Sequence, residues 1–94
     1  MSLKYHAVDV ANGATLALID VVRNPNDDSQ LIGTITPLSQ VFGVQGKERM
    51  LCNVMAMIFP FGTSDMYIAK DLLIRVGVSK EDLRSNIRYL KVVA

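Results

Sequence analysis

The residues best suited to nucleophilic or acid–base work are the single cysteine, Cys52, and the single histidine, His6. Cys52 lies inside the uncharged apolar run 50–61, where burial favours the neutral thiol over the reactive thiolate. His6 is expected on the apolar face of a strand, a position typical of a hydrogen-bonded packing residue or a subunit contact. We therefore expect no catalytic residues.

Paired carboxylates are the next candidates, and Asp9 and Asp20 are expected on one face of a β-hairpin. In the predicted register they lie ~13 Å apart at ~3.3 Å per residue. This exceeds the separation of the carboxylate pairs that hydrolyse glycosidic bonds. One histidine and one cysteine also need two further ligands to hold zinc, and the pattern identifies none. The sequence thus predicts a protein that is not an enzyme, with no metal site and no cofactor.

The clearest signal for the elements around these residues is Asn12-Gly13, between two apolar segments. Asn-Gly supplies the two positive φ angles of a type I′ turn, whose twist matches that of paired strands. A two-residue loop pairs Val8 with Ala17, His6 with Ile19 and Tyr5 with Asp20. The face expected toward the core then carries His6, Val8, Val10, Thr15, Ala17, Ile19 and Val21.

The other face of this hairpin is mixed, because Asp9 and Asp20 lie among apolar side chains. We expect a helix or a second subunit to cover part of it. The residues predicted to form such an interface are Tyr5, Leu16 and Leu18. A second candidate contact surface is the apolar segment 50–61.

The middle of the chain predicts a short strand over 31–35 and a short helix over 37–42. Thr36-Pro37 is typical of a helix start, since a hydroxyl N-cap precedes a proline at the first helical position. The apolar segment 48–59 fits either a buried strand or a buried helix. We favour a central strand that ends at Pro60.

The last third is expected to be helical. Thr63 or Ser64 can cap a helix over 65–76, and Gly77 ends it. Its apolar face is predicted to carry Met66, Ala69, Leu72, Leu73 and Val76. A second helix begins at Lys80 and continues to Lys91, with Leu83, Ile87 and Leu90 as its apolar stripe.

Together these elements predict one α+β domain over residues 1–94. An N-terminal antiparallel hairpin or meander of three or four strands is followed by two C-terminal helices packed on the sheet.

The two helices also carry a resemblance. Gly77-Val78-Ser79, with Leu83 four positions after the serine, is similar to the centre of a helix-turn-helix DNA-binding motif. The resemblance implies that the second helix enters the major groove. Its predicted nucleic-acid contacts, spaced to share one helical face, are Lys80, Arg84, Arg88 and Lys91. The alternative interpretation is two ordinary helices joined by a glycine cap, with the basic residues solvated.

The composition favours association over chemistry. Half of the 94 residues are hydrophobic, and ten Lys and Arg nearly balance nine Asp and Glu, leaving a formal net charge of +1. This balance gives no whole-protein field toward nucleic acid or an anionic membrane. A small domain buries surplus apolar surface poorly by itself. We expect a homo-oligomer, most simply a dimer, that binds a protein partner; DNA binding through residues 65–91 is the alternative.

The sequence also bears on location. Its first four residues lack the apolar stretch of a signal peptide, and the longest apolar run is shorter than the ~20 residues of a transmembrane helix. The single cysteine excludes an intramolecular disulfide. We expect a cytoplasmic protein that does not associate with membranes.

Overall fold

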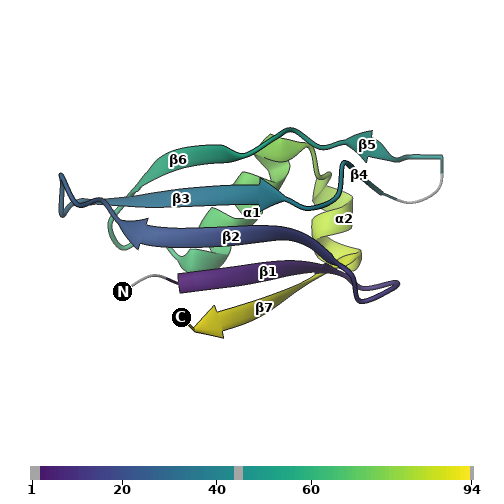
Figure 1. Cartoon of the computed structure of the whole chain (residues 1–94), viewed down its shortest axis with the longest axis horizontal. Coiled ribbons are helices and arrows are strands. Elements are labelled where there is room, and N and C mark those ends of the chain that lie inside the picture. Colours follow the sequence, from purple (N-terminus) through teal and green to yellow (C-terminus); the bar gives the residue numbers. More distant parts are fainter. Residues whose placement is uncertain (1–2, 44–45, 94) are drawn as a thin grey trace.

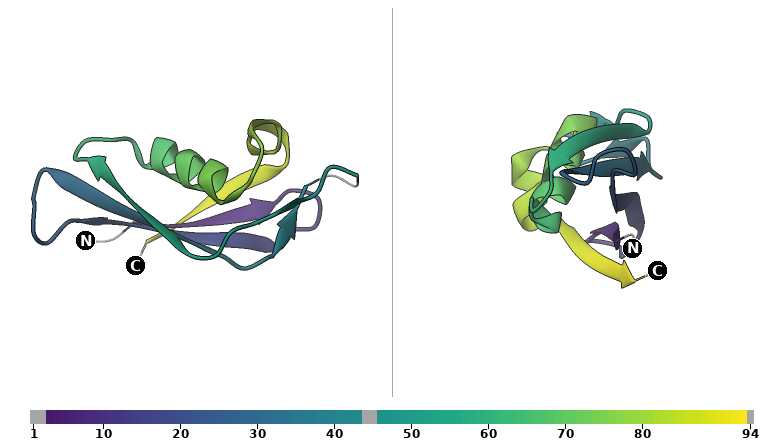
Figure 2. Two further views of the ribbon diagram at one scale, coloured as in Figure 1. Left: turned by 90° about the horizontal axis from the view of Figure 1, so that it is seen from above. Right: turned by 90° about the vertical axis from the view of Figure 1, so that its left-hand side faces the viewer.

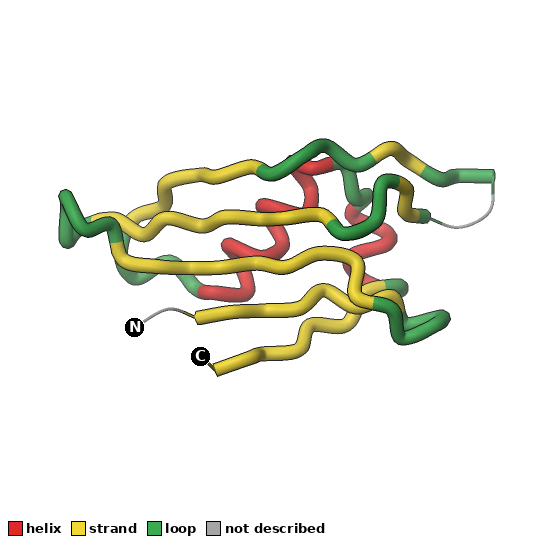
Figure 3. The backbone as a smooth tube through the Cα atoms, in the orientation of Figure 1, coloured by secondary structure: helices red, strands yellow, loops and turns green. Residues whose placement is uncertain are grey.

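The computed structural model describes residues 3–43 and 46–93 and has the predicted α+β class (Figures 1 and 3). The N-terminal strands are followed by two helices and a final strand. The elements are β1 (Leu3–Asp9), β2 (Thr15–Arg23), β3 (Gln30–Pro37), β4 (Val41–Phe42), β5 (Arg49–Met50), β6 (Met55–Pro60), α1 (Asp65–Val76), α2 (Lys80–Ser85) and β7 (Ile87–Val93).

Five strands form one antiparallel sheet in the order β6-β3-β2-β1-β7. The predicted meander is confirmed as β1-β2-β3, while β6 and β7 occupy the two edges. The short strands β4 and β5 pair with each other in a ribbon beyond the end of the main sheet (Figure 1). The sheet has more strands than expected, because β7 follows the second helix.

Both helices lie on the same face of this sheet (Figure 2). α1 contacts β2, β3 and β6, while α2 contacts β7. Successive side chains of a strand point to opposite faces, so Tyr5 and Ala7 point toward the helices and His6 points away. We call the face opposite the helices the open face, since no described element covers it.

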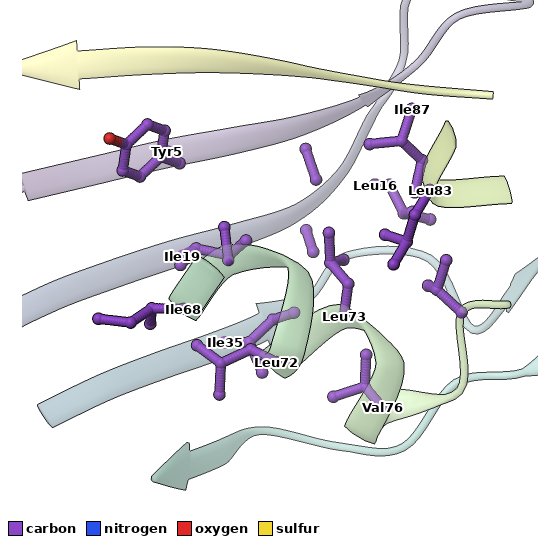
Figure 4. Close-up of a cluster of buried hydrophobic side chains, with 14 of the residues drawn as sticks. Tyr5, Leu16, Ile19, Ile35, Ile68, Leu72, Leu73, Val76, Leu83 and Ile87 are labelled. Atoms are coloured by element: carbon purple, nitrogen blue, oxygen red, sulfur yellow. The ribbon is translucent and has the colours of Figure 1, made fainter. Parts of the chain in front are cut away.

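The core lies between α1 and the helix-facing side of the sheet (Figure 4). Side chains from the central strands β2 and β3 meet two adjacent rows of α1, at positions four residues apart. Each such burial contributes roughly 1.5–3 kcal/mol. The largest side chains that are almost completely buried are Ile19, Ile35, Ile68, Leu72, Leu73 and Val76.

The bounds predicted for the first long helix are confirmed. The Oγ of Ser64 accepts a hydrogen bond from the amide of Tyr67 (3.2 Å), and Gly77 ends the helix with a φ of 120°. Met66, predicted on the buried face, is exposed instead. Ile68 takes that place, because it lies in line with Leu72 and Val76 at intervals of four residues.

The predicted two-residue turn at Asn12-Gly13 is wrong. Among the described non-glycine residues none has a positive φ, so a type I′ turn is not formed. The loop instead covers residues 10–14, and the side chains of Asp9 and Asn12 accept the amide hydrogens of Ala11 and Ala14. The register moves by one residue, pairing Tyr5 with Ile19 rather than with Asp20.

This shift exchanges the two faces of β1, because moving a strand by one residue moves each of its side chains to the opposite face of the sheet. Tyr5 and Ala7 join the core, and His6, predicted there, lies on the open face. On β2 the prediction is confirmed for Ala17, Ile19 and Val21, all of which are buried in the core. The register shifts once more between Ala7 and Val8, so that Val8 lies opposite Thr15 rather than the predicted Ala17.

The helix predicted over 37–42 is also wrong. Pro37 is the last residue of β3, where it pairs with Ala17, and Val41–Phe42 is a strand. A helix of six residues is not stable alone, and here the residues at its two ends pair in strands instead, Pro37 with Ala17 and Val41 with Met50. A proline at a strand end loses little, because its missing amide is not needed there.

The segment 48–59 is strand-forming, as favoured, but it divides into β5 and β6. The amide of Leu51 donates to the carbonyl of Gln40 (2.8 Å), and that of Cys52 donates to the carbonyl of Val76 (2.8 Å). These bonds tie the connection to other parts of the chain. β6 ends at Pro60 as predicted, but it is an edge strand and not a central one.

The second helix is much shorter than predicted. α2 ends at Ser85, and the residues from Ile87 onward pair with β1 along its whole length. The stripe of Leu83, Ile87 and Leu90 fits a helix, but the β-branched and aromatic residues of 87–93 favour a strand. Pairing with β1 decides the outcome, because that strand would otherwise be an open sheet edge.

Candidate binding surfaces

The residues considered for catalysis do not come together. Cys52 is exposed, contrary to the expected burial, because Leu51 takes the buried position beside it. His6 lies on the open face between Leu18 of β2 and Leu90 of β7. No three His, Cys, Asp or Glu side chains of residues 3–43 and 46–93 are grouped as a metal site.

The two carboxylates expected to share a face are separated by the new register. Asp20 lies on the open face, where its cross-strand neighbours are Lys4 and Thr34. Asp9 is at the end of β1, where its Oδ1 accepts the amide hydrogen of Ala11 (2.9 Å). Asp9 closes a loop, whereas Asp20 is part of a mixed strand face, so the two carboxylates do not form an acid–base pair.

Two of the three residues predicted to form an interface have side chains buried in the core of the protein. Tyr5 and Leu16 are buried in the core beneath the helices, as Figure 4 shows, and are not available to a partner. The slip in register placed Tyr5 there. Leu18 lies half-buried on the open face, so it stays a candidate contact residue.

The four basic residues predicted to share a helical face lie on two elements. Lys80 and Arg84 are on α2, whereas Arg88 and Lys91 are on β7. Three residues apart on a strand, Arg88 and Lys91 point to opposite faces of the sheet. The helix-turn-helix arrangement is therefore not formed, because its second helix has only six residues.

The edge strand β6 stands out by its sequence. No Asp, Glu, Lys or Arg occurs between Met50 and Ser64, a stretch that includes the whole strand. The exposed fractions of the large apolar residues in this stretch are high: 73% for Met50, 62% for Val54, 58% for Ile58 and 55% for Phe61. All four residues belong to the segment 50–61, which stays the second candidate contact surface.

A hollow of about 400 Å³ lies beside the end of β6. Its walls include Arg23, whose guanidinium lies 4.0 Å from the centre of the Phe61 ring, and Asp65, which accepts a hydrogen bond from Tyr5 (3.3 Å). Burial, and then the Asp65 carboxylate, raise the pKa of Tyr5. Because both charged groups already have partners in the chain, this hollow offers little to a charged ligand.

A groove with a volume of about 700 Å³ lies between the two helices. One side of α1 lines the groove with residues at three- and four-residue spacing: Tyr67, Lys70, Asp71 and Ile74. The other side of the groove is formed by residues of α2. The sequence contains this spacing, but the predicted apolar face of the helix did not include it. The α1–α2 groove is lined by Tyr67, Lys70, Asp71, Ile74, Lys80, Leu83 and Arg84.

Hydrogen bonds around Asp82 hold α2 in place at this groove. The buried Asp82 carboxylate accepts hydrogen bonds from the Ser79 hydroxyl (3.0 Å) and the Asn86 side-chain amide (2.7 Å). The amide of Asp82 in turn donates to the Oγ of Ser79 (3.2 Å). This reciprocal cap fixes both ends of a helix too short to be stable alone.

Comparisons with known proteins add no further constraint. Protein-family models, curated proteins and solved structures all give no match to this chain. Neither helix in the described part of the chain is long and apolar enough to cross a membrane.

Proposed function

We propose that this protein is a non-enzymatic binding protein that acts as a homodimer, with its two copies joined by antiparallel pairing of their β6 strands. The observation that carries the proposal is an edge strand that is apolar, uncharged and unpaired on its outer side. Among the described strands, β6 pairs with β3 alone. Its outward amides and carbonyls are ready to pair with another strand.

The opposite edge of the same sheet provides the contrast. β7 carries Arg88 and Lys91, and charged side chains on an edge strand oppose pairing with a second chain. β6 has no such residue, and its single proline, Pro60, is at its end. The sheet is therefore protected on the β7 side and open to pairing on the β6 side.

An apolar row on the open face extends toward this edge. Ile58 of β6 lies opposite Ile32 of β3, which lies opposite Val22 of β2. A two-fold axis perpendicular to the sheet would make the two β6 strands antiparallel and keep all helices on one side. Ile58 would then lie beside Ile58 or Ala56 of the second copy, and the two rows would become one.

The test is sedimentation velocity of the wild type and of two matched variants. At about 50 µM the wild type is expected to sediment at twice the 10.4 kDa chain mass, with a concentration-dependent average. Ile58→Lys puts like charges close together across the proposed pair and should weaken the dimer by at least about tenfold.

Leu90→Lys makes the matched change, since Leu90 is exposed on the same open face of the other edge strand. It should leave the dimer intact. A monomeric wild type, or equal weakening by the two substitutions, would refute pairing through β6.

A further inference from the structure

The α1–α2 groove combines apolar and basic side chains in a way that the fold itself does not require. Tyr67 and Ile74 are two turns apart on α1, and both are exposed. Single exposed apolar residues are ordinary on a surface. Here, however, both line the same groove as Leu83 of α2, so the groove offers three large apolar side chains among its charged ones.

The charge of the groove is predominantly positive. Lys70, Lys80 and Arg84 line it with a single carboxylate, that of Asp71. Asp71 is already paired with Arg75, whose Nε lies 2.8 Å from its Oδ2. The three cations have no salt-bridge partner among the described residues. A ligand that brings negative charge meets complementary charge here.

We propose that the α1–α2 groove binds an acidic amphipathic peptide segment of a partner protein. Apolar side chains of the segment would pack on Tyr67, Ile74 and Leu83, and its carboxylates would pair with the three cations around them. The volume of about 700 Å³ is within the range of sites that hold a few large side chains. The mode is that of an amphipathic helix or turn in a groove.

The observations favour a peptide over nucleic acid. A phosphate backbone would use the cations but would leave Ile74 and Leu83 without apolar contacts. The α2 helix also has too few residues to extend along a major groove. The groove does not include β6, so this proposal stands or falls separately from the dimer.

The experiment begins with selection of phage-displayed random peptides on the wild-type protein. The bound peptides are expected to be enriched in Asp and Glu interspersed with Leu, Phe or Trp. The strongest of them, synthesised with a fluorescent label, is then the probe for anisotropy. Raising the salt from about 50 to about 200 mM should weaken binding without abolishing it, because the apolar contacts persist.

Two variants and one control locate the site. Lys80→Glu with Arg84→Glu should weaken binding of the selected peptide by at least about tenfold. Lys47→Glu with Arg88→Glu makes the same change in net charge outside the groove and should leave binding within about twofold. Ile74→Ser, an exposed position on α1, should also weaken binding and does so without altering charge. Far-UV circular dichroism checks that the helices persist in each.

Three results would overturn the proposal. One is selection of peptides with no enrichment of acidic and apolar residues. Another is equal loss of binding in the groove variant and in the charge-matched control, which would show non-specific attraction. The third is tighter binding of a short duplex DNA than of the peptide, with the same dependence on Lys80 and Arg84, which would make this a nucleic-acid site.

Discussion

Gly33, in the middle of β3, is where the close approach of α1 to the sheet can be tested quantitatively. A β-carbon at this position would lie 2.8 Å from Cγ2 of Ile68, 3.1 Å from Cδ1 of Leu72 and 3.1 Å from Cε2 of Phe59. These distances are well below the roughly 3.5–4.0 Å at which carbon atoms attract best. All three groups are held in the packed core, so Gly33→Ala must displace at least one of these side chains or move α1 away from the sheet.

The expected size follows from two opposing effects. Extra volume in a packed core costs about 1–3 kcal/mol. Replacing glycine by alanine also lowers the entropy of the unfolded chain, which returns about 0.4–1 kcal/mol. The balance lies between about 0 and about 2.6 kcal/mol, so the mid-range expectation is a net destabilisation of about 1.3 kcal/mol. Each kcal/mol lowers the melting temperature by roughly 4–8 °C in a chain of this size. Urea unfolding followed by circular dichroism, at one fixed protein concentration, measures it.

A second background separates packing from other causes. Ile68→Ala removes the nearest methyl group, so Gly33→Ala should cost much less there, or even stabilise the protein. An increase in stability on Gly33→Ala in the wild type would refute the reasoning. The same cost in both backgrounds would refute it too, because the clash with Ile68 would then be absent.

Two further predictions concern single side chains. Burial raises the pKa of Tyr89 to about 12, and its buried hydroxyl has no hydrogen-bond partner among the described residues. Between pH 10 and about 12 the unfolded chain releases this proton before the folded chain does, so stability falls as pH rises. Tyr89→Phe should lose stability less steeply over that range in urea titrations, and an unchanged slope would contradict the burial. Ser79→Ala removes the cap of α2 and should cost about 1 kcal/mol in the same assay; no loss would show that Asp82 and Asn86 hold the helix without it.

The sequence predicts best the elements whose limits are set by local chemistry. α1 begins after Ser64 and ends before Gly77, because a hydroxyl cap and a positive φ act within one turn of the helix. On β2 the residues predicted to face the core, Ala17, Ile19 and Val21, are buried, although Leu16, predicted on the other face, is buried as well. In these places the local pattern and the tertiary packing favour the same structure.

The errors arise where two structures satisfy the same local pattern. Asn12-Gly13 suits a tight turn, but the Asp9 side chain stabilises a longer loop and moves β1 by one residue. Residues 80–91 fit a helix by their apolar spacing, yet β1 offers a whole strand of hydrogen bonds from Ile87 onward. A local pattern has no information about that distant partner.

The two candidate surfaces also differ in how far the sequence alone predicts them. The segment 50–61 is identifiable from the sequence as a candidate surface, because its lack of charged residues is a property of the sequence alone. The α1–α2 groove brings together Tyr67 and Ile74 with Lys80 and Arg84. It depends on the angle between two helices, and on the end of the second at Ser85, which the sequence pattern did not reveal.

Amide hydrogen exchange along β6 tests the proposed dimer most directly, in isotope-labelled protein at a concentration where sedimentation gives twice the chain mass. We predict that the β6 amides facing away from β3 are protected in the wild type and lose this protection in Ile58→Lys. The outward amides of β7 should exchange quickly in both proteins, since that edge stays free. Fast exchange of the outward β6 amides in the wild-type dimer would contradict the account, because the two copies would then meet elsewhere.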